Sequence, residues 1–411
     1  KSPKTLHITM QLSIFRKVLA GWILVQTAQG VMNSTGSASK KAKSSKSSKR
    51  SKPKGLSKID LMTQNQYLGA DLLIISVAAA SGDPAVLNNG LIDFFASVSA
   101  TDFMARVKKL AKIIAHRLPD AVGLQEVFKY TCTGNPCENE LVKNAFNDHL
   151  ELTLQALEDL GCLYEPIVIY EGTSVPFEFT FDGKDNAVAN ISDRHVILVR
   201  NDISATPVDF ACPIPSGDGC TYSTSLPTPV GNYIRGFAGV DLTIEDAKYR
   251  IIHTHLEAYY PDPTNPLSSA IQALQAQELI KTISASTPLD HSVILIGDIN
   301  SGTHAEIIEE PFLIVPPYIQ FINAGYIDVW PASKGASTKS GFTCCEDEDL
   351  LNPDSKLDIR IDMIFSVDAP FKASRAKVLG TKESDKTKTG LWPSDHVTFA
   401  AELHFDISGE D

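Results

Sequence analysis

Six short segments, spread over more than 300 residues, carry carboxylate, amide or imidazole side chains beside apolar runs. Carboxylate and amide oxygens are ligands of hard cations such as Mg²⁺, and imidazole exchanges protons near neutral pH. Most of the segments follow or end a β-branched run, so these groups are expected at strand ends, where they can converge on one pocket. The pattern predicts attack of water on a metal-bound phosphoester. The residues are Asn65, Glu126, His255, Asp298, Asn300, Asp362, Asp395 and His396.

Three of these residues are candidate metal ligands. Glu126 ends the run AVGLQEV, where a carboxylate is costly unless it faces an open site or a cation. Asn65 offers an amide oxygen as a second ligand, directly or through water, although a lone Asn after a strand is more often a turn residue. Asp395 is expected to complete the metal shell from the side opposite Glu126. Mg²⁺ is the expected ion, with Mn²⁺ or Ca²⁺ as alternatives.

The segment VILIGDINS contains the most specific short motif, a Gly-Asp-x-Asn sequence after an apolar run. Residues two apart on an extended chain share one side, which places the carboxylate of Asp298 beside the amide of Asn300. Asp298 can orient or deprotonate the attacking water, and Asn300 can donate a hydrogen bond to a phosphate oxygen. An ordinary turn is the alternative, but the preceding apolar run favours the end of a buried strand.

Histidine and a third carboxylate supply the acid–base chemistry. His396 is the candidate general base, and Asp362 can fix the orientation of His396 or of His255. His255 can donate to a phosphate oxygen or to the leaving group. His253 is two residues earlier and should point to the same face of the strand, so periodicity alone does not decide which of the pair is functional.

These side chains require strands that end at a common edge. Several predicted strands are apolar on both faces, which suits sheets that are covered on both sides. Two sheets packed together with helices outside satisfy that requirement. Strands are expected within 59–63, 121–127, 163–170, 195–200, 234–243, 250–255, 293–297, 361–365 and 397–405, and helices at 101–118, about 139–160 and about 268–284, the last capped by Ser268 or Ser269.

Charge separates an N-terminal tail from an acidic body. Residues 1–55 hold 12 of the 37 Lys and Arg residues and no Asp or Glu, which leaves 56–411 with a formal charge of −24. Such a body lacks the broad basic surface that gives non-specific affinity for nucleic acid, but it suits a protein that holds cations. With 43% hydrophobic residues in the chain, 56–411 is expected to form one catalytic domain with a buried core.

The N-terminal tail divides into two predicted parts. Residues 1–30 have the pattern of an upstream extension and a signal peptide, because Arg16 and Lys17 precede an apolar stretch too short to span a bilayer. A membrane anchor or a buried helix is the alternative. Residues 31–55 are rich in Ser and Lys and are expected to form a disordered linker. The linker is expected to act as a tether, with adhesion of residues 40–54 to an anionic surface as the alternative.

All seven cysteines lie after the predicted signal peptide. In an oxidising compartment, Cys132 with Cys137 and Cys212 with Cys220 are suitable local disulfides. The odd count leaves at least one unpaired thiol or an intermolecular bond. Glycosylation sequons are consistent with an exported glycoprotein. They begin at Asn33 and Asn190.

Together the six segments resemble the endonuclease/exonuclease/phosphatase superfamily, the DNase I-like metal phosphoesterases. The resemblance covers roughly residues 58–405 and implies a four-layer α/β sandwich with two central mixed sheets, outer helices and one Mg²⁺ site at the sheet ends. It also implies that Glu126 binds metal with help from Asn65 and Asp395, while His396 is the general base. The motifs in order are Asn65, Leu124-Gln125-Glu126, Thr254-His255-Leu256, Gly297-Asp298-Ile299-Asn300, Arg360-Ile361-Asp362 and Ser394-Asp395-His396.

The expected function is that of a secreted, Mg²⁺-dependent phosphodiesterase that works as a monomer. Its substrate is expected to be a phospholipid or nucleic acid. Tyr67 departs from some nuclease branches, which carry Asp two residues after the first Asn. The acidic run at 346–349 is expected to be a solvated loop, with a second cation site as the alternative. A catalytically silent protein that binds surfaces through its basic tail is the other functional hypothesis, and the intact candidate residues argue against it.

Overall fold

The structure is a computed structural model that describes residues 56–258, 266–310, 312–333, 341–367 and 371–406. The predicted signal peptide and linker lie outside the described residues. Among the helices that are described, none is long and apolar enough to cross a lipid bilayer.

The first sheet carries Asn65 at the end of its central strand. Its strands are β1 (Leu56–Asn65), β2 (Ala121–Gln125), β3 (Lys129–Thr133), β4 (Tyr164–Phe179), β5 (Ala187–Arg200), β16 (Phe371–Leu379) and β17 (Thr398–Asp406). Within the described residues they pair in the order β16-β17-β1-β2-β5-β3, and β4 also pairs with β5. β1 and β2 are parallel, with Asn65 opposite Gln125, so the end of β1 lies beside the residue that precedes Glu126.

The second sheet carries the strands that bear His255, Asp298 and Asp362. Its members are β6 (Ser204–Pro207), β7 (Pro215–Ser216), β8 (Gly219–Thr221), β11 (Gly236–Ile244), β12 (Ala247–His255), β13 (Ser292–Asp298), β14 (Ile327–Asp328) and β15 (Asp362–Val367). The described strands pair in the order β14-β15-β13-β12-β11-β8-β7, and β6 also pairs with β11. β12 and β13 are parallel, whereas β15 returns antiparallel to β13. Both sheets are therefore mixed, as predicted.

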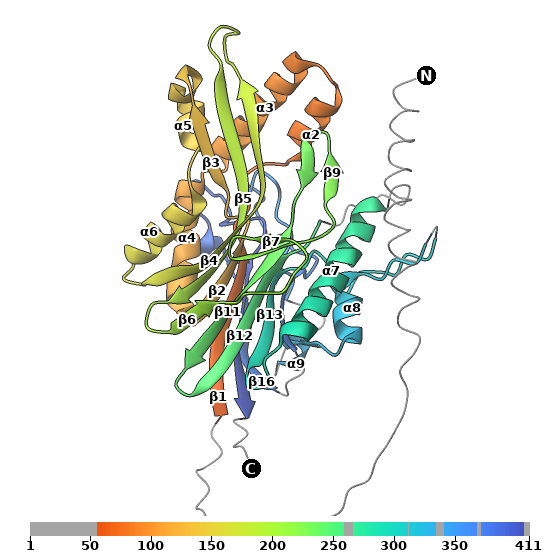
Figure 1. The fold of residues 1–411 in the computed structure, drawn as a ribbon. Helices are drawn as coiled ribbons and strands as arrows, with labels where there is room; N and C mark the ends of the chain where they lie inside the picture. The colour runs from red at the N-terminus through yellow and green to blue at the C-terminus, as the bar shows by residue number, and fades with distance from the viewer. Residues whose placement is uncertain (1–55, 259–265, 311, 334–340, 368–370, 407–411) are drawn as a thin grey trace, which may run out of the picture. The chain divides into compact units, whose positions relative to one another are not determined.

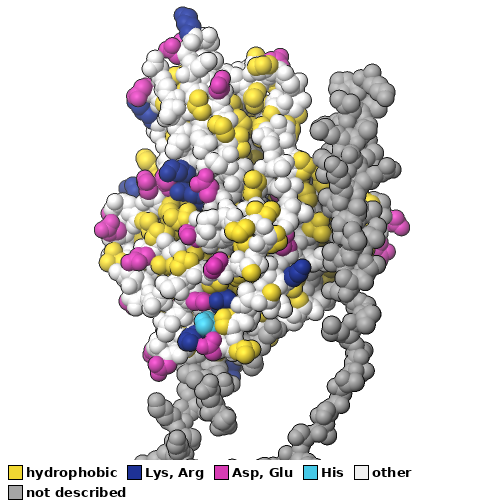
Figure 2. Space-filling view, in the orientation of Figure 1, with side chains coloured by type: hydrophobic (Ala, Val, Ile, Leu, Met, Phe, Trp, Pro, Cys, Tyr) yellow, Lys and Arg dark blue, Asp and Glu magenta, His cyan; other side chains and the backbone are white. Residues whose placement is uncertain are grey.

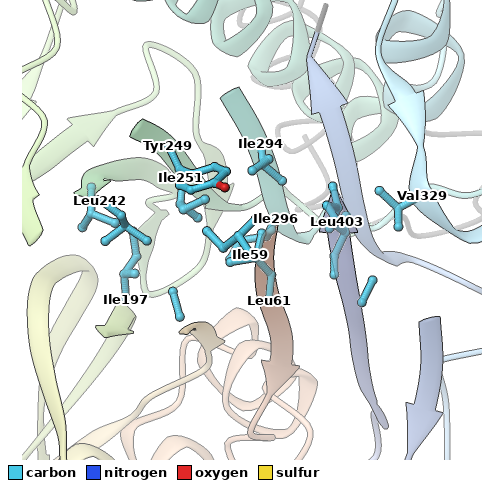
Figure 3. Packing of buried hydrophobic residues seen from close by; sticks show 14 of the residues in the cluster. Ile59, Leu61, Ile197, Leu242, Tyr249, Ile251, Ile294, Ile296, Val329 and Leu403 are labelled. Carbon is cyan, nitrogen blue, oxygen red and sulfur yellow. The ribbon is translucent and has the colours of Figure 1, made fainter. Parts of the chain in front are cut away.

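The two sheets pack face to face through a continuous hydrophobic core. Figure 3 shows Ile59 and Leu61 of β1 near Ile294 and Ile296 of β13, and all four side chains are fully buried. Met62 lies on the opposite face of β1 and packs in a different cluster. This alternation follows from the two-residue period of a strand, and it explains why β1 is apolar on both faces.

Helices cover the outer face of each sheet (Figure 1). On the first sheet, α4 (Phe103–Arg117) and α6 (His149–Glu158) bury residues such as Leu110 and Leu157 against Val122 of β2. On the second sheet, α7 (Leu267–Ser286) and α8 (Pro317–Asn323) pack in the same way, with Leu279 and Phe321 against Leu295 of β13. The order helix, sheet, sheet, helix confirms the predicted four-layer α/β sandwich.

Two helix predictions were wrong in detail. The helix expected at about 139–160 is two helices, α5 (Glu140–Ala145) and α6, because Asp148 leaves the helical conformation and caps α6 through Leu150 N–H. Ser268 and Ser269 are not caps, since α7 begins at Leu267 after Pro266. The remaining elements are α2 (Leu73–Ala80), α3 (Pro84–Ala100), α9 (Val329–Ala332), the paired strands β9 (Leu226–Thr228) and β10 (Gly231–Tyr233), and the 3₁₀ turns η1 (Asn135–Glu138) and η2 (Glu383–Asp385).

The cysteines form three local disulfides. Cys132 is bonded to Cys137 and Cys212 to Cys220, which confirms both predicted pairs. The adjacent residues Cys344 and Cys345 form the third disulfide. Cys162 is the free thiol, in agreement with the odd number of cysteines.

Candidate active site

Three predicted site residues lie side by side on neighbouring strands of the second sheet. His255 of β12 is the register partner of Asp298 of β13, and Asp298 is the partner of Asp362 of β15. All three are buried, and His255 Nε2 lies 3.4 Å from Asp298 Oδ2. The row forms where the carboxyl ends of two parallel strands meet the start of the returning strand.

Asn65 and Glu126 face this row from the first sheet. Asn65 Nδ2 donates to Glu126 Oε1 (3.0 Å) and to Asp298 Oδ2 (3.2 Å), so one amide joins the two sheets. Glu126 has a left-handed backbone with a φ of 54°, a conformation that costs energy for a residue with a side chain. Its other carboxylate oxygen accepts a hydrogen bond from Leu68 N–H (2.8 Å), which fixes the carboxylate in place.

His396 is held by a carboxylate from the opposite sheet. Its Nδ1 donates to Asp362 Oδ2 over 2.8 Å, which leaves Nε2 as the nitrogen for proton exchange. Burial lowers the pKa of His396, but the charges of Asp362 and Asp395 outweigh burial and raise that pKa well above its ordinary value. The loop before it is fixed because Ser394 Oγ donates to the backbone carbonyl of Asn65 (2.8 Å).

The Gly-Asp-x-Asn motif forms the predicted turn at the end of β13. Asn300 N–H donates to Asp298 Oδ1 (2.9 Å), and Asn300 has a left-handed φ of 49°. Its Nδ2 donates to the backbone carbonyl of Leu256 (3.0 Å), one residue beyond His255. The motif therefore positions a carboxylate and an amide at the ends of β12 and β13.

The acidic groups fit a hard divalent cation. Burial, and then the neighbouring charge of Asp395, raise the pKa of Glu126. Burial likewise raises the pKa of Asp395. Asp362 Oδ1 is buried and has no hydrogen-bond partner among the described residues. Ligand atoms of Asp298, Asp362 and His396 lie within 4.8 Å of one another. Buried carboxylates that repel one another are stabilised by a cation, and oxygen donors suit Mg²⁺.

The two histidines of β12 occupy different places. His253 contacts the side-chain amide of Gln125 between the two sheets, and burial lowers its pKa to about 3. His255 lies in the cluster beside Asp298. The geometry thus brings His255 rather than His253 to the other predicted site residues.

Arg235, which was not identified from the sequence, determines which ring nitrogen of His255 carries the proton. Its Nη1 donates to His255 Nδ1 (2.7 Å) and to Asp193 Oδ2 (3.2 Å), and Tyr233 OH donates to the same oxygen (3.1 Å). Because an arginine only donates, His255 Nδ1 must accept, and a neutral ring then carries its proton on Nε2. Burial and then Arg235 lower the pKa of His255 well below its ordinary value, so the neutral form is favoured.

A second buried arginine ties the site loops together. Arg106 of α4 donates to the carbonyls of Gln66 (2.9 Å), Tyr67 (3.1 Å) and Pro393 (2.9 Å). The first two follow Asn65 and the third precedes the Asp-His motif. Arg106 therefore fixes the two loops of the first sheet relative to each other.

The acidic run at 346–349 is not simply a solvated loop. Glu346 is buried and accepts from Asn352 Nδ2 (2.7 Å), Ser355 Oγ (2.6 Å) and Lys356 N–H (2.8 Å). Its own N–H donates to the carbonyl of Asp395 (2.8 Å). The carboxylate of Glu346 therefore closes its own loop, and the backbone N–H of Glu346 joins that loop to the segment that carries the Asp-His motif. The prediction of full solvation was wrong for Glu346.

The four-layer fold and the clustered donors at the sheet ends define an α/β-sandwich protein with a polar centre suited to a metal. The chain matches the Endonuclease/Exonuclease/phosphatase family over residues 87–396 and belongs to that family, whose members are metal-dependent phosphoesterases. A comparison with curated proteins gives no match.

Several solved structures resemble the chain. An endonuclease/exonuclease/phosphatase from Beutenbergia cavernae is 17% identical, with a TM-score of 0.50 over 85% of this chain and 72% of that chain. D. rerio TDP2 complexed with single strand DNA product is 16% identical, with a TM-score of 0.48 over 84% and 99%. A family protein from Bacteroides thetaiotaomicron is 16% identical, with a TM-score of 0.48 over 86% and 100%. At these identities, the similarity to the Beutenbergia cavernae structure supports the fold and nothing finer.

Proposed function

We propose that the protein is a Mg²⁺-dependent phosphodiesterase. The supporting observation is the register row of His255, Asp298 and Asp362 on the second sheet, joined to Asn65 and His396 of the first sheet by direct hydrogen bonds. Two sheets that contribute to one buried polar cluster provide rigid support on both sides of a substrate.

Glu126 and Asp395 are the residues proposed to hold the ion, with Mn²⁺ and Ca²⁺ as alternatives. When bound, the metal supplies positive charge that reduces the repulsion between a phosphate and an incoming nucleophile. Asn65 is assigned to positioning, because its Nδ2 is used by two carboxylates and its Oδ1 accepts from Tyr67 N–H (2.9 Å).

The remaining residues are assigned to hydrolysis itself. Asp298 orients a water molecule, whose oxygen forms a bond to phosphorus while the ester oxygen on the far side leaves. His396 Nε2 takes the proton of that water, and Asp362 holds the imidazolium that results. His255 Nε2–H and the Asn300 amide donate to phosphate oxygens, where negative charge accumulates. The leaving oxygen receives its proton from solvent.

The substrate is proposed to be a phospholipid-like diester in preference to nucleic acid. The formal charge of −24 on 56–411 opposes a polyanion, although a local groove can overcome such repulsion. Export to an oxidising compartment remains a proposal, and the three disulfides support it.

The test is hydrolysis of bis-p-nitrophenyl phosphate with Mg²⁺ and with EDTA. EDTA should abolish turnover, and His396→Ala should lower kcat by at least about 10²-fold, the scale of one general base. His404→Ala is the matched control, since His404 is bonded to Ser374 and Glu402 on strands away from the cluster. Full activity in EDTA or in His396→Ala contradicts the proposed function.

Substrate preference is then measured with sphingomyelin, plasmid DNA, RNA and inositol phosphates, each with and without Mg²⁺. Faster turnover of DNA or RNA than of sphingomyelin would reject the preference for lipid-like diesters while leaving phosphodiester hydrolysis in place.

A further inference from the structure

An apolar pocket lies beside the candidate active site. It is formed by α2, β4, β5 and the β9–β10 pair, and its empty volume is about 460 Å³, including the part open to solvent. In Figure 1, α2 and β9 are drawn next to each other at this end of the fold. The apolar wall of the pocket includes Ile75, Phe177 and Ile191, each of which is buried.

The pocket wall is joined to the candidate catalytic cluster by a chain of hydrogen-bonded side chains. Asp193 and Tyr233 form part of that wall. Asp193 is bonded to Arg235 (3.2 Å), and Arg235 is bonded to His255 (2.7 Å). Another wall residue, Phe128, is two positions after Glu126. A substrate whose phosphate lies at Glu126 and His255 would therefore have an adjoining group at the mouth of this pocket.

Most polar groups of the wall are already hydrogen-bonded, and Asp193 Oδ1 is the buried wall atom that has no partner among the described residues. Tyr233 OH already donates to Asp193 Oδ2, and Thr228 Oγ1 donates to the carbonyl of Gly231 (2.6 Å). Thr173 Oγ1 accepts from Ile234 N–H (2.6 Å). A nucleobase has donors and acceptors along its edge that would lose their hydrogen bonds to water here, whereas an alkyl chain loses none.

The distribution of charge on the protein surface also favours a hydrocarbon group over a nucleic acid. Figure 2 shows basic side chains mixed with acidic ones rather than gathered in a continuous stripe on the face that is drawn. Nucleic-acid channels use a basic stripe to follow the backbone. The acidic body and the apolar wall together fit a substrate with one phosphate and a hydrocarbon group.

We propose that this pocket binds an alkyl chain attached to the scissile phosphate, so that the substrate is an alkyl phosphodiester of lipid-like character. The proposal rests on the proposed phosphodiesterase function and adds the place where the hydrocarbon group of the substrate binds. Burial of one methylene improves binding by about fourfold when the methylene is fully removed from water. Activity should therefore rise with chain length until the pocket is filled.

The experiment measures kcat/KM with Mg²⁺ for ethyl, butyl and hexyl p-nitrophenyl phosphate, in which the alkyl group stays on the phosphate and p-nitrophenol is released. The expected result for the wild-type protein is at least a tenfold increase from ethyl to hexyl. Ser76→Phe should bring the ratio of kcat/KM for the hexyl ester to that for the ethyl ester close to 1, because Ser76 lines the pocket and a phenyl ring fills it.

Val77→Phe is the matched control, since Val77 is the next residue of α2, is 69% exposed and is not part of the pocket wall. This variant should keep the chain-length dependence of the wild-type protein. Thermal unfolding of both variants shows whether each is folded.

Thymidine 5′-(p-nitrophenyl phosphate) tests whether the pocket binds a nucleobase instead. If the wild-type protein prefers this ester to the hexyl ester, and Ser76→Phe removes that preference, the pocket is assigned to a nucleobase and the proposal is overturned.

Failure of the two proposals is distinguishable. Turnover that is independent of chain length overturns the alkyl pocket and leaves the phosphodiesterase function in place. Absence of turnover for every ester overturns the function, and the pocket is then judged by calorimetry with hexyl phosphate and ethyl phosphate. Tighter binding of hexyl phosphate that is lost in Ser76→Phe supports the pocket, while equal affinities overturn it.

Discussion

At the scale of single residues, the protonation of His255 depends on a side chain outside the recognised motifs. Arg235 fixes which nitrogen of His255 accepts, and Asp193 in turn balances the charge of Arg235. Burial raises the pKa of Asp193 to about 7, although the charge of Arg235 acts to lower it. The three residues form one buried unit, so a change in one affects the charge state of the others.

Arg235→Met should lower kcat by about 10- to 100-fold, the usual cost of losing a group that orients a functional histidine. It also leaves Asp193 buried without its cation, at a cost of about 3–5 kcal/mol in stability. The double variant Arg235→Met/Asp193→Asn should recover most of that stability but not the turnover. Denaturant unfolding and kcat, measured on both variants, test the assignment. Recovery of turnover in the double variant would show that Arg235 acts only on stability.

Asn65, Glu126 and Asp298 end or follow apolar runs in the sequence, whereas Asp362 begins the strand β15 and His396 stands before the strand β17. Their convergence could be expected, since parallel strands place their carboxyl ends together. The choice between His253 and His255 could not be made, because both lie on the same face and differ only in depth between the sheets. Arg235 had no signal beyond a single Arg before an apolar strand, and that pattern is usually a solvated strand end.

At the scale of elements, Asp148 determines where α5 ends and α6 begins. Its Oδ1 accepts from Leu150 N–H (2.9 Å), and its carboxylate also pairs with Arg194 of β5. Burial raises the pKa of Asp148, but the hydrogen bonds and charge of Arg194 outweigh burial and lower that pKa below its ordinary value. The residue thus caps a helix and binds that helix to the first sheet.

Asp148→Asn should cost about 1–3 kcal/mol at pH 7, because asparagine keeps the cap but leaves Arg194 without a charged partner. Asp148→Ala should cost about 1 kcal/mol more, since it also removes the cap. A carboxylate with a lowered pKa in the folded state stabilises above the unfolded pKa, near 4, and that stabilisation is lost as pH falls further. The difference between wild type and Asp148→Asn should therefore be constant from about pH 5 to 8 and shrink below about pH 4.

Denaturant unfolding across this pH range measures both effects. Asp159→Asn is the control, because Asp159 is exposed at the other end of α6 and should change stability by less than about 0.5 kcal/mol. A loss in Asp148→Asn that is the same at pH 3 and pH 7 would show that Arg194 does not stabilise the charged form.

Several elements could not be read from the sequence for physical reasons. The segment LLIISVAAA that contains α2 is apolar without a clear period, and such a run fits a buried strand as well as a helix. The edge strand β16 contains Lys372, Arg375 and Lys377, so it lacks the apolar pattern of the central strands. Charged residues at an edge prevent pairing with other chains, which is a property of the assembled sheet and not of the strand alone.

At the scale of the whole molecule, charge is divided between a basic segment and an acidic body. Residues 40–54 hold eight of the Lys and Arg residues, and 56–411 has a formal charge of −24. The basic segment precedes both β1, which begins at Leu56, and the family match, which begins at residue 87. Two roles are compatible with this division: a tether, or adhesion to an anionic surface.

Deleting residues 34–54 from the full chain should leave kcat/KM for bis-p-nitrophenyl phosphate unchanged, because every residue of the candidate site lies in the acidic body.

Co-sedimentation with phosphatidylserine vesicles distinguishes a tether from an adhesive segment. If the segment is a tether, it contributes nothing to binding of the vesicles. If it is adhesive, each basic residue near the membrane contributes about 1 kcal/mol to binding, and salt above 0.1 M weakens that contribution by screening. A variant that replaces the eight basic residues with glutamine keeps the length and separates charge from spacing. Loss of turnover of the soluble ester in that variant would show that the segment takes part in catalysis, because neither a tether nor an adhesive segment acts on a substrate free in solution.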